Sequence, residues 1–467
     1  MILASVRLEQ LEPARRALAE GRYEAAFALL EHAADGAPAG AVRALYHLHL
    51  AAADALYGHD GLDRGLRALR AAAAADPASV RRPLYRALHW EFRALQGAGA
   101  GEVRRGVRRL GEEGDGVAAY HAASALWIAG AGRSARKALD AIDPQRLPTY
   151  LRWRWWSILG HARADVGEYD AAAEAFETAA AGAAPSERAP IHVSWAAALL
   201  DLGRADAVLD LLEPVEASEL TPADAAWADE LAGRAELELG NPRRALVRFD
   251  AADAAHPTGP RRFALAQARA QALSRLGRFA EAAERLADAL PDAPEEELAF
   301  AVHERAIALL EGDALDAAER EFEELLLDPD YPHRSEATAD LAEVRLRRGD
   351  LPGARETAGR ALEAGAVGPA CLILGTVAFE YFDLDEAIVW LERAVSATQP
   401  GDPTWLAAHQ LLADVHAQRG PAAAEQVLLH ARQALAHVEP GSEWVGPLES
   451  HVDQARRWLG GAERWLN

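Results

Sequence analysis

Residues 156–185 read WSILGHARADVGEYDAAAEAFETAAAGAAP, and this stretch decides the fold. Apolar and small residues recur every three or four positions on both sides of Gly167, which is the spacing of one helix face. Gly167 can adopt the left-handed conformation that ends a helix, and Pro185 blocks continuation of the second helix. The stretch therefore predicts two helices joined by a short turn.

The same signals for a turn between helices recur along the chain. A glycine that precedes a turn and a new helix returns at intervals of 35 to 37 residues, with one longer interval of 71. These turns contain Gly167, Gly203, Gly240, Gly277, Gly312, Gly349 and Gly420. Within the longer interval we expect a degenerate turn at 382–384, where Phe-Asp-Leu stands. Two helices and a turn per repeat of this length indicate a helical solenoid, in which each hairpin buries its face only against its neighbours.

At these offsets the chain resembles the tetratricopeptide repeat (TPR) family. The best copy has Trp156, Leu159, Gly160, Gly167, Tyr169, Ala172, Phe176 and Ala179. It departs from the signature where Arg163 replaces a tyrosine and where the proline comes one residue late, at Pro185. A second copy has Gly233, Gly240, Ala245, Phe249, Ala252 and Pro257. The resemblance implies an all-α, right-handed superhelical solenoid of about 11–12 TPR-like helix-turn-helix repeats with a C-terminal cap helix.

The strength of the repeat pattern varies along the chain and predicts three parts. Residues 1–115 are expected to form divergent TPR-like repeats, residues 116–440 the regular array, and residues 441–467 a capping helix. The glycine-dense piece at 97–101 fits the pattern poorly. It indicates either an irregular repeat with a loose turn or a seam between two stacks.

Small and large residues are expected to alternate where helices meet. Gly160, Gly233 and Gly375 would let the two helices of a hairpin approach closely, with Phe176 and Phe249 filling the space beside them. The segment 150–156, YLRWRWW, is denser in aromatic residues than a repeat requires. Its Trp153 and Trp155, and Trp458 and Trp465 near the C-terminus, are expected either to pack on neighbouring repeats or to form a contact surface.

Composition narrows the classes of function. The chain has 467 residues, with 49 Lys and Arg against 72 Asp and Glu, and a net charge of −23. This charge opposes non-specific attraction to nucleic acid or to an anionic membrane. The single cysteine, Cys371, excludes a disulfide framework and is expected to be a buried packing residue. The start of the chain does not resemble a signal peptide and no long apolar run occurs, which predicts a cytoplasmic protein.

No catalytic motif survives inspection, so we expect a protein that is not an enzyme and that needs no cofactor or metal. P-loop, G-x-S-x-G and H-E-x-x-H patterns are absent from the sequence. His409 and His416 are seven residues apart, as are His430 and His437. Each pair lies on one helix face, but helical rise separates the two rings by about 10 Å, too far for one ion.

The resemblance implies that the first helices of the hairpins line a concave groove, where TPR proteins usually bind an extended peptide or a helix of a partner. Alignment to the signature places in this groove Ser157, His161, Asp165, Trp227, Glu230, Arg234, Gln267, Gln271, His303 and Glu343. Their mixture of polar, amide and acidic groups suggests a basic or mixed-polarity ligand. The sequence therefore favours a non-enzymatic protein-protein interaction scaffold or adaptor, or else a regulatory TPR protein that controls a transcription or signalling partner in trans. The remaining alternative is a solvated groove without a ligand.

A third hypothesis comes from charge. The segment 81–109 is rich in arginine, and its candidate basic patch consists of Arg81, Arg82, Arg104, Arg105, Arg108 and Arg109. Basic residues interleaved with aromatic ones are typical of surfaces that bind nucleic acid. Helical periodicity, however, places Leu84, Leu88 and Phe92 on one buried face, which indicates that the aromatic residues belong to the core and disfavours direct nucleic-acid binding. The acidic segment 292–330 could instead attract the basic patch of another copy and produce self-association.

Overall fold

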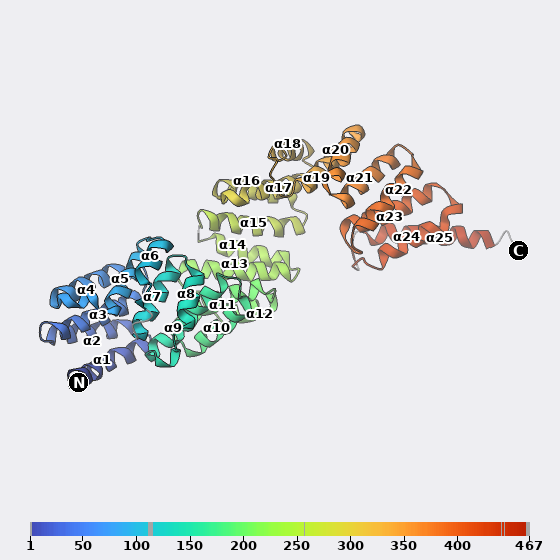
Figure 1. The fold of residues 1–467 in the computed structure, drawn as a ribbon. Helices are drawn as coiled ribbons and strands as arrows, with labels where there is room; N and C mark the ends of the chain where they lie inside the picture. Colours follow the sequence, from blue (N-terminus) through green and yellow to red (C-terminus); the bar gives the residue numbers. More distant parts are fainter. Residues whose placement is uncertain (1, 111–114, 256, 440, 443, 464–467) are drawn as a thin grey trace. The chain divides into compact units, whose positions relative to one another are not determined.

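The computed structural model describes residues 2–110, 115–255, 257–439, 441–442 and 444–463, with side chains described from residue 11 to residue 460 within these ranges. The described part is all-α and contains no strand (Figure 1). Its 25 α-helices are α1 Ile2–Ala19, α2 Tyr23–Gly36, α3 Ala41–Ala55, α4 Leu62–Ala75, α5 Pro83–Leu95, α6 Ala100–Val107, α7 Gly116–Ile128, α8 Gly132–Asp140, α9 Thr149–Ala164, α10 Tyr169–Gly182, α11 Pro185–Asp201, α12 Ala205–Leu212, α13 Pro222–Glu238, α14 Pro242–Asp253, α15 Pro260–Arg275, α16 Phe279–Ala289, α17 Glu295–Glu311, α18 Leu315–Leu325, α19 Arg334–Arg347, α20 Leu351–Ala364, α21 Val367–Glu380, α22 Leu384–Ala397, α23 Pro403–Gln418, α24 Ala424–Leu435 and α25 Val445–Glu463.

The helices divide between two compact units, Met1–His256 and Pro257–Asn467, which we call unit 1 and unit 2. Unit 1 holds α1 to α14 and unit 2 holds α15 to α25. In each unit consecutive helices pack side by side, so that every odd-numbered helix up to α23 and its successor form one repeat (Figure 1). The last helix, α25, packs on α24 through Leu448, Val452 and Ala455. The all-α repeat fold predicted from the turn spacing is thus confirmed.

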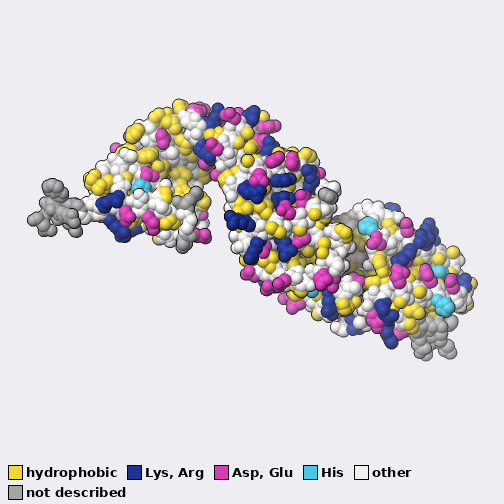
Figure 2. Space-filling view, turned by 180° about the vertical axis from the view of Figure 1, so that it is seen from behind, with side chains coloured by type: hydrophobic (Ala, Val, Ile, Leu, Met, Phe, Trp, Pro, Cys, Tyr) yellow, Lys and Arg dark blue, Asp and Glu magenta, His cyan; other side chains and the backbone are white. Residues whose placement is uncertain are grey.

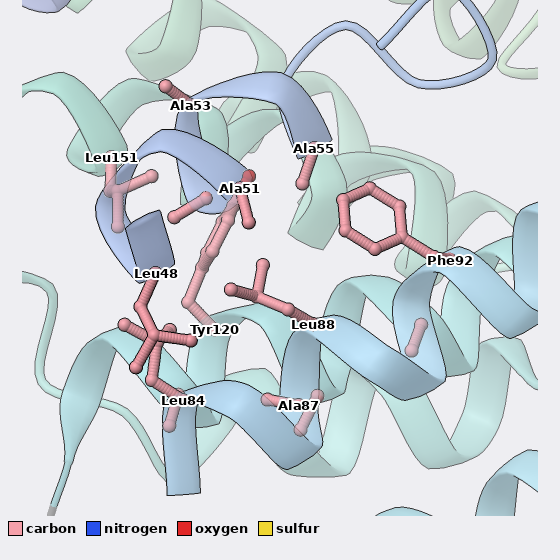
Figure 3. Packing of buried hydrophobic residues seen from close by; sticks show 14 of the residues in the cluster. Leu48, Ala51, Ala53, Ala55, Leu84, Ala87, Leu88, Phe92, Tyr120 and Leu151 are labelled. Carbon is pink, nitrogen blue, oxygen red and sulfur yellow. The ribbon is translucent and has the colours of Figure 1, made fainter. Parts of the chain in front are cut away.

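The repeat at the glycine-dense segment is irregular. Helix α5 packs mainly against α7, whereas the short α6 contacts both helices only lightly. Phe92 of α5 lies in the unit 1 core with Leu88 and Leu84, as the helical period predicts (Figure 3). Both α5 and α6 belong to unit 1, and Gly97 between them has φ of +90°.

One turn geometry joins most of the hairpins. At Gly240, φ is +77°, its N–H donates to the carbonyl of Leu237 at 3.1 Å, and the N–H of Asn241 donates to the carbonyl of Glu236 at 2.8 Å. This is the helix-ending motif in which a left-handed residue satisfies the last carbonyl groups. A glycine suits the position because it has no Cβ to clash with the following carbonyl.

Phe382 occupies the equivalent position in the turn between α21 and α22. Its φ is +61° and its N–H donates to the carbonyl of Phe379 at 2.8 Å, while Asp383 donates to Ala378 at 2.9 Å. A bulky residue is strained in this conformation, and Phe382 is 77% exposed, so that burial of its ring offsets little of the strain. The degenerate turn predicted at 382–384 therefore keeps the backbone of the glycine turns.

We expect Phe382→Gly to stabilise the protein by about 0.5–1 kcal/mol, because it relieves left-handed strain and removes few contacts. Thermal unfolding measured by calorimetry checks this expectation. Gly349→Ala, at a turn with φ of +79°, is the matched reverse change and should destabilise by a similar amount. A lower melting temperature for Phe382→Gly would show that the exposed ring makes a stabilising contact.

Close approach of helices explains the other glycines that the repeat pattern singles out. A Cβ at Gly233 would lie 2.5 Å from the Phe249 ring, and a Cβ at Gly160 would lie 2.8 Å from the Phe176 ring. Gly375 is equally tight, since its Cβ would lie 2.7 Å from Leu391. The predicted pairing of a small residue with a large one across each hairpin is confirmed at these three places.

Candidate functional site

The candidate site is a cavity of about 660 Å³ in unit 1, which we call the unit 1 cavity. Its walls come from α3, α5, α7, α9 and the start of α11, together with the turns that follow α3 and α7. Each of these five helices is the first of its hairpin. The cavity therefore runs along the helix faces that the TPR resemblance assigns to a ligand.

The wall of the unit 1 cavity mixes apolar surface with polar groups. Aromatic rings of Tyr120, Trp127 and Trp153 stand beside aliphatic side chains and beside hydroxyl and carboxylate groups. Such a lining can bury apolar parts of a ligand and fix its orientation through a few polar contacts. The described lining residues are Ala55, Leu56, Gly58, His59, Glu91, Leu95, Tyr120, Ser124, Trp127, Ile128, Gly130, Trp153, Arg154, Ser157, Ile158, Asp165 and Glu187.

Arg154 is the most unusual wall residue because its guanidinium group is buried, with 7% exposure. Its Nη1 donates to the carbonyl of Tyr150 at 2.6 Å, and its Nη2 donates to the hydroxyl of Tyr23. The Tyr23 hydroxyl in turn contacts the carboxylate of Glu187, and the guanidinium carbon lies 3.9 Å from the centre of the Trp153 ring. Burial raises the pKa of Tyr23, so the hydroxyl stays protonated between the arginine and the glutamate.

A second buried polar pair stands behind the same wall. Glu91 of α5 and His121 of α7 are 3% and 0% exposed, and Oε2 of Glu91 lies 2.6 Å from Nδ1 of His121. Nε2 of His121 is buried without a hydrogen-bond partner in the described part of the chain. Burial is the main cause of the raised pKa of the neighbouring Tyr120, with the charge of Glu91 adding to it and that of Arg154 opposing it. The pair ties α5 to α7 across the irregular repeat.

The structure brings part of the predicted groove set to this cavity. Ser157 and Asp165, both on or just after α9, line the wall. His161 instead packs between two rings, stacked on Trp127 with centroids 4.8 Å apart and edge-on to Phe176 at 4.9 Å. Burial lowers the pKa of His161 to about 4, which keeps the imidazole neutral. His161 thus supports Trp127, and Trp127 is the residue that meets the cavity.

Two predicted residues meet at a smaller cavity of about 300 Å³ in unit 2, between α15, α16 and α17. Gln267 donates from Nε2 to Oε2 of Glu304 at 2.7 Å, and Gln271 donates to Oε1 of the same carboxylate at 3.5 Å. Ile307 and Phe279 supply apolar wall beside this amide and carboxylate cluster. First helices again supply the polar groups, here from α15 and α17.

His303 and Glu343 occupy more enclosed positions on first helices of unit 2. His303 is buried, with Nδ1 2.7 Å from the Tyr331 hydroxyl and Nε2 2.9 Å from Oδ2 of Asp340. Both ring nitrogens are therefore engaged within the fold. Glu343 is half-buried on α19, and burial, with Glu311 and Asp340 nearby, raises the pKa of its carboxyl group.

The predicted residues of α13 lie together on one helix. Trp227 packs against the apolar cluster shared by α9 to α13. Glu230 accepts a hydrogen bond from Nη2 of Arg234 at 2.9 Å, one turn further along the helix. The Glu230 side chain is 13% exposed and that of Arg234 is 38% exposed, so the pair occupies the surface of its own helix.

Most of the basic patch is exposed, whereas the nearby rings of Trp90 and Phe92 are half-buried and buried. Arg104, Arg105, Arg108 and Arg109 are all exposed on α6 or just after it, and Arg81 is exposed before α5, whereas Arg82 is half-buried and 3.9 Å from Asp76. Phe92 is fully buried, and the ring of Trp90 covers Gly106, where a Cβ would lie 1.9 Å from it. Figure 2 shows Lys and Arg side chains interspersed with Asp and Glu on the face that it presents.

Other sequence expectations concern isolated residues. Cys371 is buried, as predicted, in a cluster with Leu391 and Leu412, and burial raises the pKa of its thiol. Trp153 and Trp155 are buried, at 7% and 5% exposure, while Trp458 is half-buried against the α23–α25 cluster. Trp465 lies outside the described residues.

The described residues contain no group of three or more His, Cys, Asp or Glu side chains arranged to hold a metal ion. Their helices are too short or too polar to cross a lipid bilayer.

Sequence reasoning missed Arg154, Tyr120 and the pair of Glu91 with His121. The aromatic density of residues 150–156 was the one available signal for Arg154 and Trp153. Glu91 and His121 are 30 residues apart on helices of different repeats, and no motif links them. Only the packing of α5 directly on α7 brings them together.

The repeated hairpins and their shared glycine turns define a helical solenoid, and a cavity lies along the first helices of unit 1. More specifically, the chain has a TPR-like fold, which the turn spacing and the small-to-large pairs of the chain itself establish.

Comparison with known proteins adds solved structures of low similarity. No family model matches the chain, and no curated protein matches it. A tetratricopeptide repeat protein from Parabacteroides merdae is 14% identical, with 57% of this chain and 98% of that chain covered and a TM-score of 0.48. Cut9–Hcn1, a hetero-tetramer of APC/C, is 13% identical over 95% of each chain with a TM-score of 0.40. PilF of Pseudomonas aeruginosa is 17% identical over 49% of this chain and 98% of that chain, with a TM-score of 0.35.

Proposed function

We propose that this chain is a non-enzymatic scaffold or adaptor that binds an extended peptide or a helix of a partner protein along the first helices of unit 1. The observation that carries the proposal is the unit 1 cavity, which five successive first helices line with aromatic, aliphatic and polar side chains. A ligand that spans several repeats gains small contributions from each, as solenoid binding surfaces do. We propose a cytoplasmic location for this activity.

The charges at the cavity favour a basic or mixed-polarity peptide. Asp165 and Glu187 line it on or beside first helices, and Glu91 lies deeper in the wall. Arg154 already donates to Tyr150 and Tyr23, so its guanidinium is partly occupied by the fold. A basic side chain of the ligand can therefore pair with the carboxylates while an apolar side chain covers Trp127.

Blocking the cavity should abolish partner binding. Ser157→Arg places a long charged side chain on the cavity wall, and we expect at least a tenfold weaker Kd for a partner recovered with the wild-type protein. Thr178→Arg is the matched control, because Thr178 is exposed on α10, the second helix of the same hairpin. Affinity purification from the native cell followed by calorimetry gives both measurements. Equal affinity of wild type and Ser157→Arg for every recovered partner would refute binding in this cavity.

The regulatory alternative differs from the scaffold in the identity of its partner. A transcription factor or signalling protein that is retained by Thr178→Arg and lost by Ser157→Arg would support control in trans. The nucleic-acid alternative has less support, because Phe92 is fully buried and the rings of Tyr85 and Trp90 pack against the unit 1 core, away from the exposed arginines of the segment 81–109. Base stacking on such rings is what non-specific single-strand binding needs.

A further inference from the structure

Histidine rings gather between the last two paired helices of unit 2. His409 and His416 of α23 meet His430 of α24, with Nδ1 of His409 3.0 Å from Nδ1 of His430. The rings of His416 and His430 are stacked, 5.5 Å apart and 6° from parallel. Trp405 adds a fourth ring, 4.2 Å from His409. We call His409, His416 and His430 the histidine cluster.

The contact between two Nδ1 atoms constrains the protonation of the cluster. One imidazole must donate its N–H while the other accepts with a lone pair, so at least one of the two rings is neutral. If both rings were protonated, two N–H groups would face each other at 3.0 Å and two positive charges would repel. His409 is only 3% exposed and His430 is half-buried, so water screens that repulsion poorly.

The helices packed around the cluster bring few carboxylates to it. The charge of Glu392 of α22 raises the pKa of His416, whereas the charge of Arg419 at the end of α23 lowers it. His437, just after α24, likewise lowers the pKa of His409 through its charge. Cys371 of α21 packs on α23, and His451 of α25 contacts Asp414 of α23 at 3.0 Å. Most of the charges that act on the cluster are thus positive, which favours its neutral state.

We propose that the histidine cluster is a pH-sensitive latch, which holds α23 on α24 while its rings are neutral and releases them when the cluster takes up protons. Nδ1 of His416 is buried and has no hydrogen-bond partner among the described residues, which gives the cluster a further protonation site that the closed hairpin does not satisfy. The latch is independent of the unit 1 cavity and of the function proposed for it.

The consequence of release falls on the end of the array. Trp405 of α23 and Val427 of α24 belong to the apolar cluster that also contains Leu448 and Val452 of α25. Separation of α23 from α24 removes the α23 side of this apolar cluster, although α25 still packs on α24. Acidification is therefore expected to loosen the last helix and expose apolar surface of the cluster.

The pH range in which the latch opens follows from the lowered pKa values of its histidines. Burial lowers the pKa of His409 and of His430 to about 4, with neighbouring histidines adding to the effect, below the value of 6.5 for an exposed imidazole. The closed state thus binds fewer protons than the open one, so its advantage is complete above pH 6.5 and is lost as the pH falls towards 4. One such histidine shifts the equilibrium between the closed and open hairpin by about 30-fold towards the open state when the pH falls from 7.5 to 5.0.

Hydrogen exchange on the full chain tests the latch. We expect amides of α23, α24 and α25 to lose protection by at least about 30-fold between pH 7.5 and 5.0, after correction for the intrinsic exchange rate. Amides of α21 and α22 in the same unit serve as the internal reference and should change much less. Equal loss across all five helices would overturn the proposal.

The double variant His409→Gln and His430→Gln removes titration while keeping a side-chain donor and acceptor at each position. It should lose most of the pH response of α23 to α25, whereas His32→Gln, an exposed histidine of unit 1, should retain it. A full response in the double variant would contradict the latch. Should the double variant fail to fold, NMR titration of the wild-type histidine rings decides: pKa values near 6.5 for His409 and His430 would overturn the proposal, and values below about 5 would support it.

Discussion

Replacement of His121 with leucine should lower the free energy of unfolding of unit 1 by about 3–5 kcal/mol. Glu91 is 3% exposed and its Oε2 contacts Nδ1 of His121 at 2.6 Å, so the variant leaves a buried carboxylate without that partner. The desolvation penalty of the carboxylate is then no longer offset by the contact with the imidazole.

A double-mutant cycle checks the origin of this loss. Glu91→Leu combined with His121→Leu removes both partners, and we expect the double variant to recover much of the stability that His121→Leu loses. Urea denaturation monitored by circular dichroism gives the free energies, and hydrogen exchange at α5 and α7 locates the change. Additive losses in the two single variants would mean that the pair does not act as a unit.

Phe249→Ala should lower the free energy of unfolding by a similar amount, about 3–5 kcal/mol, because it leaves a cavity in the hairpin of α13 and α14. Phe249 is fully buried, and its ring fills the space that Gly233 leaves, where a Cβ would lie 2.5 Å away. The glycine cannot expand to fill the void, and its helix backbone is held by neighbouring repeats. Relaxation around the cavity is therefore limited and the cost approaches the upper part of the range.

Val247→Ala is the matched control, since Val247 lies on the same helix with 68% exposure. We expect it to change the free energy of unfolding by less than about 0.5 kcal/mol. Calorimetry of the full chain, with hydrogen exchange of the amides of α13 and α14, separates the two variants. A Phe249→Ala protein as stable as Val247→Ala would mean that the hairpin repacks around the lost ring.

The hairpins could be predicted from sequence because their signals are local. The glycine at each turn and the small residue opposite a large one act within one repeat, and Gly240, Gly233 and Phe249 show both devices in a single hairpin. Local signals repeated in register also explain why Phe382 could be placed in a turn although it is not glycine. Its neighbours required the same backbone, and the chain adopts it despite the strain.

The site could be predicted only in part, because it depends on contacts between repeats. Ser157 and Asp165 face the unit 1 cavity as the signature implies, but His161, one turn beyond Ser157, supports Trp127 from behind. Whether a first-helix residue meets a cavity or a neighbouring ring depends on the side chains of the adjacent hairpin. No spacing within one repeat contains that information.

The histidine cluster shows the same limit more sharply. His409 and His416 are too far apart along α23 to share an ion, and the sequence offered no reason to join them to α24. The ring of His430 contacts both of them, at 5.2 Å from His409 and 5.5 Å from His416. Likewise, the division after residue 256 falls between two hairpins whose repeat signals continue across it.

The common turn has a consequence for the history of the chain. Gly130, Gly167, Gly203, Gly240, Gly277 and Gly349 have φ values between +67° and +79°, and after each of them the next N–H donates to the carbonyl five residues earlier. Because the backbone leaves the first helix in the same direction at each of these glycines, excising the segment from one turn to the next would rejoin two ends of matching geometry. Duplication or loss of whole hairpins can thus lengthen or shorten the array without a new connection, and such a gene can explore different lengths in single steps.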